Sequence, residues 1–174
     1  MQPFIVTLQF DDQTDAMLQD LRSTHFPPKL NKVPAHLTLF HQLAETEERR
    51  VFEAIGQAAT ETEAFLVSLT GPMPLGRGVA IRVEADGLLK LRARLAGAFE
   101  RFLIGQDRQK FRPHVTIQNK TTKARARGLL DHLTQTWKPI SGVGEGLQIW
   151  RYEGGPWSPV ASVLFKPSPA LGQK

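Results

Sequence analysis

Apolar residues are concentrated in seven short segments of the chain, and these segments predict β-strands. The segments are rich in β-branched and aromatic residues, and most are bounded by Gly, Pro, Asn or Asp residues that favour turns. They are residues 4–10, 35–43, 64–70, 78–85, 114–119, 144–152 and 159–166. The first segment is apolar almost throughout, which indicates a buried strand.

Four longer segments repeat their apolar residues at intervals of three or four positions, the spacing of an amphipathic helix. They are residues 13–23, 46–60, 87–103 and 123–137. The second segment begins at Thr46, a residue type that caps helices, and acidic residues occupy its first turn. The stretch 25–34 contains three prolines and predicts a loop.

The order helix, strand, helix, strand, strand occurs twice along the chain, after one additional strand at the start. The strand after the first helix of each copy carries the pattern His, apolar, Thr, apolar, and the two histidines lie 78 positions apart. A duplicated unit is expected to form two lobes related by a pseudo-twofold axis. We therefore predict an α+β fold with a single bilobal domain over residues 1–174. The predicted lobes span 11–85 and 86–166, with the strand 3–10 added and a tail at 167–174.

The composition excludes several kinds of chemistry. The chain of 174 residues has no cysteine, which excludes disulfides, thiol nucleophiles and thiolate metal ligands. Its formal net charge is +5, which weakly favours phosphate-bearing partners, although the basic residues are spread along the chain. No apolar run is long enough to cross a bilayer, and the first residues do not resemble a signal peptide, so we expect a cytoplasmic protein.

Two matched segments, residues 34–40 and 112–118, carry the candidate chemistry. Because the side chains of a strand alternate between its faces, each segment presents a His, a Thr and one further residue on one face. These residues are His36, Thr38 and Phe40 in the first segment and His114, Thr116 and Gln118 in the second. The apolar residues between them point to the opposite face, into a core. If the two strands face each other across the pseudo-twofold axis, one site holds two histidines and two threonines.

Two histidines and two threonines suit the metal-independent cleavage of a phosphodiester. A neutral imidazole accepts a proton from the attacking water or hydroxyl, and a protonated imidazole donates one to the leaving oxygen. The ordinary pKa of histidine, about 6.5, allows both states near neutral pH. The threonine hydroxyls can donate hydrogen bonds to the non-bridging oxygens, where charge builds up. One such motif alone is more often an ordinary strand, but a matched pair in matched halves favours chemistry.

The segments VPAHLTLF (33–40) and FRPHVTIQ (111–118) resemble the two signature motifs of the two-histidine (2H) phosphoesterase superfamily. They are most similar to its bacterial 2'-5' RNA ligase-like branch, which includes RNA 2',3'-cyclic phosphodiesterases. The resemblance implies an antiparallel sheet in each lobe, helices outside, and the active site in a groove between the lobes. It also implies that His36 and His114 are the acid/base pair and that Thr38 and Thr116 hold the phosphate, with no cofactor and no metal. Water activation would belong to His114 and protonation of the leaving group to His36.

Further residues are predicted to bind the substrate: Phe40, Arg82, Arg112, Gln118, Lys120 and Arg151. Phe40 suits either stacking on a base or core packing. Arg82 and Arg151 suit either an anion contact or a solvated strand face. Many relatives in the resembled family carry a basic residue soon after the second motif, where Gln118 or Lys120 would have to take its place. His41 is expected at the surface, at the end of its strand.

The predicted function is the opening of 2',3'-cyclic phosphate ends by a monomeric enzyme whose partners are RNA ends or small cyclic nucleotides, with no membrane partner. The first alternative is 2'-5' RNA ligation or the hydrolysis of small cyclic nucleotides. A further alternative is a protein that binds RNA ends or nucleotides without turnover, which predicts tight, salt-dependent binding.

Overall fold

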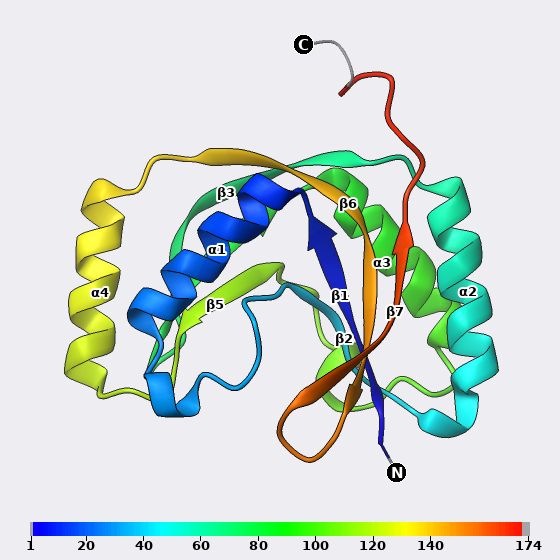
Figure 1. Ribbon diagram of the computed structural model, residues 1–174, viewed down its shortest axis with the longest axis horizontal. Coiled ribbons are helices and arrows are strands. Elements are labelled where there is room, and N and C mark those ends of the chain that lie inside the picture. Colours follow the sequence, from blue (N-terminus) through cyan, green and yellow to red (C-terminus); the bar gives the residue numbers. More distant parts are fainter. Residues whose placement is uncertain (1, 172–174) are drawn as a thin grey trace.

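The computed structural model describes residues 2–171, in which helices and strands follow one another much as the apolar pattern predicts (Figure 1). The strands are β1 (Phe4–Phe10), β2 (Thr38–Leu43), β3 (Phe65–Pro74), β4 (Val79–Glu84), β5 (His114–Gln118), β6 (Ile140–Tyr152) and β7 (Trp157–Leu164). The α-helices are α1 (Asp12–His25), α2 (Glu48–Glu61), α3 (Asp86–Phe99) and α4 (Lys123–Thr136), and the short 3-10 helices are η1 (Pro28–Leu30), η2 (Glu45–Glu47) and η3 (Gly105–Arg108). No helix in this part of the chain is long and apolar enough to cross a membrane.

The strands pair in one antiparallel sheet, which curls like part of a barrel (Figure 1). The strand order is β2-β1-β6-β3-β4-β5, and β7 pairs with β6 beside this path. The long strand β6 connects the sheet, because its first residues pair with β3 and its later residues pair with both β1 and β7. The predicted α+β class with antiparallel strands is confirmed. The two strands of the His-x-Thr motifs, β2 and β5, lie at opposite ends of the path.

The helices lie outside the sheet, with α1 and α4 on one side of the molecule and α2 and α3 on the other (Figure 1). Helix α1 contacts β5 and α4 contacts β3, whereas α2 contacts α3 and β7. Each side therefore combines elements of both halves of the chain. This packing departs from the predicted lobes of 11–85 and 86–166, because antiparallel pairing joins β3 and β4 to β5 in one sheet. The duplication of an α/β unit stays a prediction.

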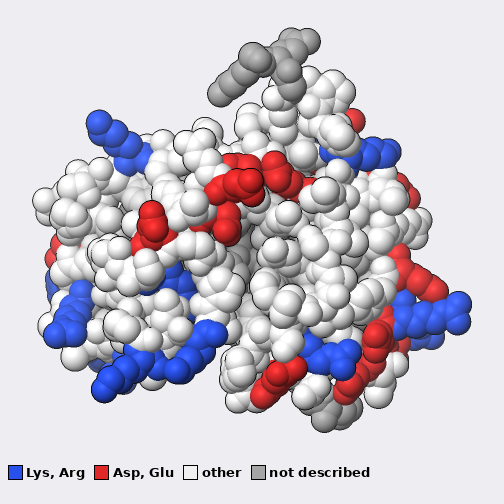
Figure 2. Space-filling view, in the orientation of Figure 1, with Lys and Arg blue, Asp and Glu red and all other residues white. Residues whose placement is uncertain are grey.

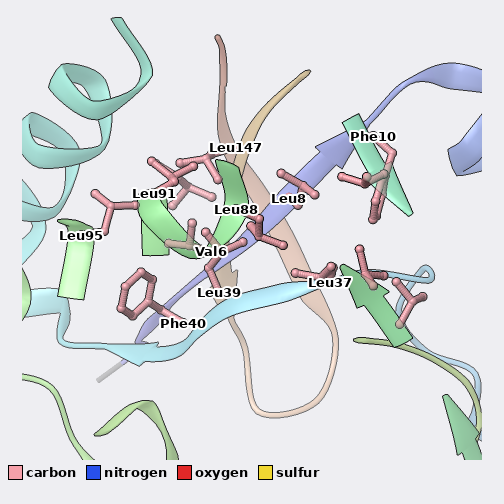
Figure 3. Close-up of a cluster of buried hydrophobic side chains, with 14 of the residues drawn as sticks. Val6, Leu8, Phe10, Leu37, Leu39, Phe40, Leu88, Leu91, Leu95 and Leu147 are labelled. Atoms are coloured by element: carbon pink, nitrogen blue, oxygen red, sulfur yellow. The ribbon is translucent and has the colours of Figure 1, made fainter. Parts of the chain in front are cut away.

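Apolar faces of the sheet and helices meet in one core (Figure 3). Strand β1 contributes Val6 and Leu8, and α3 contributes its predicted apolar stripe, which includes Leu88. Burying each such side chain stabilises the fold by roughly 1.5–3 kcal/mol. Leu37 and Leu39 of the first motif also lie in this core, so the side chains between them point away from it.

The start of α1 is tied to β6. The Asp11 carboxylate accepts hydrogen bonds from the backbone N–H of Thr14, at 2.9 Å, and from that of Val143, at 2.7 Å. A Cβ atom at Gly142 would collide with the Thr14 side chain, so glycine allows the helix to lie this close to the strand. Strand β6 accordingly begins at Ile140, earlier than its sequence pattern predicts.

Candidate functional site

His36 and His114 are held in the same way. In each ring, Nδ1 lies 2.7 Å from the carbonyl oxygen of the residue two positions earlier, Pro34 for His36 and Arg112 for His114. A carbonyl oxygen only accepts hydrogen bonds, so Nδ1 carries the hydrogen and donates in both rings. The second nitrogen, Nε2, is left to exchange a proton with a ligand. Both imidazoles are thus fixed in the same tautomer.

A β-bulge follows Thr38 on β2. Thr38 pairs with Thr7 of β1 and Phe40 pairs with Val6, so two steps along β2 match one step along β1. The extra residue turns Phe40 to the opposite face of the sheet. There the ring is fully buried, and its centroid lies 5.0 Å from that of Phe99 (Figure 3). The prediction that Phe40 stacks on a base is therefore wrong.

Strand β5 has a bulge at the same point. Thr116 pairs with Ala80 of β4 and Gln118 pairs with Val79, again two steps against one. The Gln118 side chain is consequently turned inward and buried, and its Oε1 has no hydrogen-bond partner within residues 2–171. The prediction that Gln118 contacts the substrate is wrong for the same reason as for Phe40. The two motif strands therefore share the regular alternation up to the threonine and an irregularity directly after it.

Two cavities divide the four motif residues between them. The larger cavity, of about 600 Å³, is lined by His36 and Thr116, and the smaller one, of about 290 Å³, is lined by Thr38 and His114. Each cavity thus joins the histidine of one motif to the threonine of the other. The two rings are also close enough for the charge of His114 to lower the pKa of His36. The two ends of the sheet path therefore meet at one site.

The ring of Trp157 covers His36, with centroids 4.4 Å apart and planes inclined at 49°. Burial is the main cause that lowers the pKa of His36 to about 4, and the positive charges of Arg22, His41 and His114 act in the same direction. The backbone hydrogen bond of the ring opposes them. In the absence of a bound anion, His36 is therefore neutral at pH 7.

Three of the predicted basic contacts surround the site. Lys120 lines the larger cavity, and Arg112 lines the smaller one. Arg112 also lines a third cavity, of about 630 Å³, together with Arg82. Arg82 pairs with His114 across the β4–β5 ladder, which explains its position beside the motif. These exposed cations are in reach of a ligand that extends beyond the four motif residues.

Arg151 lies elsewhere. It pairs with Phe4 at the start of β1, and its guanidinium lies over the Phe4 ring, 5.2 Å from the centroid. One of its nitrogens lies 3.7 Å from the Glu45 carboxylate. Its strand position thus directs it to an apolar and acidic neighbourhood, and it does not line these three cavities. A contact between Arg151 and the substrate stays a prediction.

Several residues of the larger cavity were not predicted from the sequence, and Arg22 and Trp157 are the two that lie nearest to the motif chemistry: Arg22 donates to the Thr116 carbonyl and Trp157 covers His36. Arg22 follows Leu18 by one turn of α1, on the buried face of the helix. A charged residue on an apolar helix face is a signal that could have identified it. Trp157 follows a Gly-Gly-Pro turn at the start of β7, and nothing in that local pattern separates it from an ordinary surface aromatic residue.

His41 is exposed at the surface, as predicted, and a buried carboxylate also holds it beside the smaller cavity. Asp107 of η3 accepts hydrogen bonds from the backbone N–H groups of His41 and Gln42 and from Nδ1 of His41, each at 2.9 Å. The Asp107 side chain is almost fully buried, whereas that of His41 is 46% exposed. The pair adds a third imidazole to the cavity that contains Thr38 and His114.

Basic side chains gather near one part of the surface. On the face in Figure 2, Lys and Arg residues collect at the lower left, over η1 and the lower end of α4, whereas Asp and Glu residues collect at the top and at the lower right. Lys32 and Lys120 both line the larger cavity. Residues 2–171 contain no group of three or more His, Asp or Glu side chains that could hold a metal ion. Imidazoles, hydroxyls and nearby cations together suit a phosphate-bearing ligand.

Solved structures with the same fold include TT0787 of Thermus thermophilus, with 19% identity, coverage of 97% of this chain and 100% of that chain, and a TM-score of 0.70. LigT of E. coli complexed with 3'-AMP has 19% identity, coverage of 94% and 98%, and a TM-score of 0.67. A crystal structure described as a phosphoesterase has 17% identity, coverage of 95% and 99%, and a TM-score of 0.66. No curated protein sequence matches the chain at a significant level.

The sequence profile of one family matches the chain from residue 10 to residue 156. This range covers well over half of the chain and includes β2, β5 and both motif histidines. It agrees with the resemblance that the two motifs indicate. The chain therefore belongs to the 2'-5' RNA ligase superfamily, whose members are 2H phosphoesterases.

Proposed function

We propose that the protein is a metal-independent phosphodiesterase that opens 2',3'-cyclic phosphate ends of RNA or nucleotides by paired-histidine catalysis. The observation that carries this proposal is the matched pair of imidazoles. Both rings donate a hydrogen bond through Nδ1 to a carbonyl and leave Nε2 to a ligand. Each ring shares a cavity with the threonine of the other motif, and this arrangement supports an acid, a base and two hydroxyl donors that act on one phosphate. A single chain contains all four residues, so a monomer suffices for this chemistry.

In hydrolysis, a neutral imidazole accepts a proton from water while the water oxygen attacks the phosphorus. The bond from phosphorus to the 2'- or 3'-oxygen of the ribose breaks, and the other imidazole donates its proton to that oxygen. The hydroxyls of Thr38 and Thr116 donate hydrogen bonds to the non-bridging oxygens as charge builds up there. The family resemblance assigns water activation to His114 and protonation of the leaving oxygen to His36. The reverse reaction exchanges these two roles.

A nucleotide partner is supported by the ligands of a related protein. LigT of E. coli has been solved with 3'-AMP, phosphate, NADP+ and ATP. In the present chain, the exposed cations Lys120, Arg112 and Arg82 lie around the motif residues, where they suit further phosphates of a bound RNA end. Both RNA ends and small cyclic nucleotides therefore belong in the first substrate test.

The test is a hydrolysis assay with EDTA present, using a short RNA that ends in a 2',3'-cyclic phosphate and a 2',3'-cyclic mononucleotide. Wild type is expected to turn over at least one of them. His36→Ala and His114→Ala should each lower the rate by about 10²–10⁴-fold, the usual contribution of one acid/base group. His132→Ala serves as the matched control, because His132 is an exposed histidine on α4. Full activity in both site variants would show that the paired histidines are not the catalysts.

The name of the superfamily favours 2'-5' RNA ligation as a second candidate function. The same residues would then catalyse attack of a 5'-hydroxyl on the cyclic phosphate in place of water. Two RNA fragments, one ending in a 2',3'-cyclic phosphate and one beginning with a 5'-hydroxyl, would be incubated with the protein. A product with a 2'-5' linkage supports ligation. Tight binding of these RNAs without any product would instead support a non-catalytic binding protein.

A further inference from the structure

Arg22 is a buried cation in the larger cavity. It lies on the inner face of α1, with 4% of its surface exposed. It lines the cavity together with His36 and Thr116, one residue from each motif. Lys32 and Lys120 line the same cavity, but the side chains of these two lysines are more accessible to water. Arg22 therefore differs from the other cations of the cavity in being removed from bulk water.

The protein accepts hydrogen bonds from only some of the N–H groups of the Arg22 guanidinium. Its Nε donates to Asn31 Oδ1 at 2.8 Å, and its Nη1 donates to the carbonyl oxygen of Thr116 at 2.9 Å. The group lies over the ring of Phe26, 4.2 Å from the centroid. Within residues 2–171, Nη2 has no hydrogen-bond acceptor. The two N–H groups of Nη2 are thus left for a ligand.

Arg22 also lacks a negative partner. No Asp or Glu in the described chain forms an ion pair with it, and burial alone lowers its pKa to about 10. Arg92 of α3 provides the contrast, because burial also lowers its pKa but the charge of nearby Asp107 opposes this effect. A buried charge without a partner is strongly unfavourable. An anion in the larger cavity would supply the partner that Arg22 lacks.

We propose that Arg22 binds a phosphate group of the ligand through Nη2 and is the main anion-binding residue of the site, contributed by a helix outside both motifs. A planar guanidinium suits a phosphate better than the exposed lysines do, since it can donate in a fixed geometry. Through Nη1, Arg22 also holds the backbone of Thr116, so the phosphate contact and the second motif are coupled. The identification of this phosphate as that of a substrate rests on the proposed function, whereas the anion site itself does not.

The experiment measures the affinity of inorganic phosphate and of 3'-AMP by isothermal titration calorimetry. Wild type is compared with Arg22→Met, which keeps the length and apolar character of the buried side chain, and with Arg22→Lys. Arg101→Met is the matched control, because it removes the same charge from an exposed arginine that follows α3, outside the basic patch over η1 and α4. Loss of one charge-assisted hydrogen-bonding group predicts an affinity about 10- to 100-fold lower for Arg22→Met. The affinity of Arg22→Lys should lie between those of wild type and Arg22→Met, and the affinity of Arg101→Met should stay within about twofold of wild type.

Equal phosphate affinity in wild type and Arg22→Met would overturn the proposal, as would no binding to wild type at about 10 mM phosphate. If Arg22→Met does not fold, the side-chain ¹⁵N resonances of Arg22 are followed in wild type, assigned through Arg22→Lys. A shift during the phosphate titration supports the contact, and its absence overturns it. Failure of the proposed function is recognised separately. Arg22-dependent phosphate binding with no turnover of any cyclic phosphate would keep the anion site and reject the phosphodiesterase.

Discussion

His36 and His114 share one backbone hydrogen bond but have different surroundings. Trp157 covers His36, and the carboxylates of Asp12 and Asp15 line a separate recess that also reaches this histidine. Its depressed pKa means that the free protein holds a neutral imidazole next to cations at neutral pH. A bound phosphate would reverse this preference, because a negative charge favours the imidazolium.

The depressed pKa of His36 predicts a specific dependence of stability on pH. Burial lowers this pKa from 6.5 to about 4, so between these values the unfolded chain binds a proton at His36 that the folded chain does not. The free energy of unfolding therefore rises with pH through this window and falls as the pH is lowered from 6.5 towards 4. His36→Asn removes this contribution, so wild type should lose up to about 3 kcal/mol more than the variant.

Urea unfolding at several pH values measures this difference. Other titrating groups are common to both proteins, so their effects largely cancel in the comparison. Parallel stability curves for wild type and His36→Asn between pH 4 and 6.5 would contradict the burial of a neutral imidazole at this position.

The motif strands combine a regular part with an irregular part. Up to Thr38 and Thr116, successive side chains of each motif alternate between the two faces of the sheet. The polar side chains therefore point to the cavities, and the apolar ones are buried. The bulge that follows in each strand then directs Phe40 and Gln118 inward. Beyond its bulge, β2 is held by η3, whose Asp107 carboxylate accepts hydrogen bonds from the strand backbone. Each element thus stops presenting residues to the site directly after its threonine.

Asp107→Asn tests how far η3 supports β2. The substitution keeps the shape of the side chain but places an amide NH₂ group against N–H donors. Because the site is buried and the lost hydrogen bonds go to a charged acceptor, we expect the free energy of unfolding to fall by about 2–4 kcal/mol. Chemical denaturation measures this loss. Asp131→Asn, at an exposed position on α4, is the control and should change stability by less than about 0.5 kcal/mol. A loss equally small for Asp107→Asn would mean that the carboxylate does not hold the strand.

Helices from each half of the chain contact the motif strand of the other half. Helix α1 packs on β5, the strand of the second motif, and its Arg22 donates to the carbonyl of Thr116. Helix α3 packs on α2, and its Arg92 donates to the carbonyl of Leu39 in the first motif strand. A helix from one half therefore supports the motif of the other half, and the two motifs are brought together by the same contacts that form the core.

These contacts between the two halves predict a single cooperative unfolding transition. The three tryptophans lie in different parts of the fold, with Trp137 against β3, Trp150 on β6 and Trp157 on β7. Labelling with 5-fluorotryptophan gives each a separate ¹⁹F resonance, and the three native signals should disappear with one midpoint in urea. Loss of the Trp137 signal at a clearly lower urea concentration than the other two would show that the halves unfold independently.

Local patterns predict the elements well and the irregularities poorly. Most strands and all four helices are confirmed near their predicted bounds, because periods of two and of three to four residues follow directly from backbone geometry. The positions of His36 and Thr38 opposite Leu37 and Leu39 follow from the same rule. The rule fails at Phe40, since a bulge depends on how the strand pairs with β1.

The amino-acid order alone thus specifies two matched His-x-Thr strands, their outward faces and the family to which they belong, because these are short-range properties. Folding in three dimensions decides which side chains join them. Arg22 and Trp157 reach the cavity from α1 and β7, whereas Arg151 and Gln118 are directed away from it. Such choices depend on contacts between residues far apart in the chain. The hydrophobic periodicity of the sequence does not predict those contacts, because it describes each segment separately.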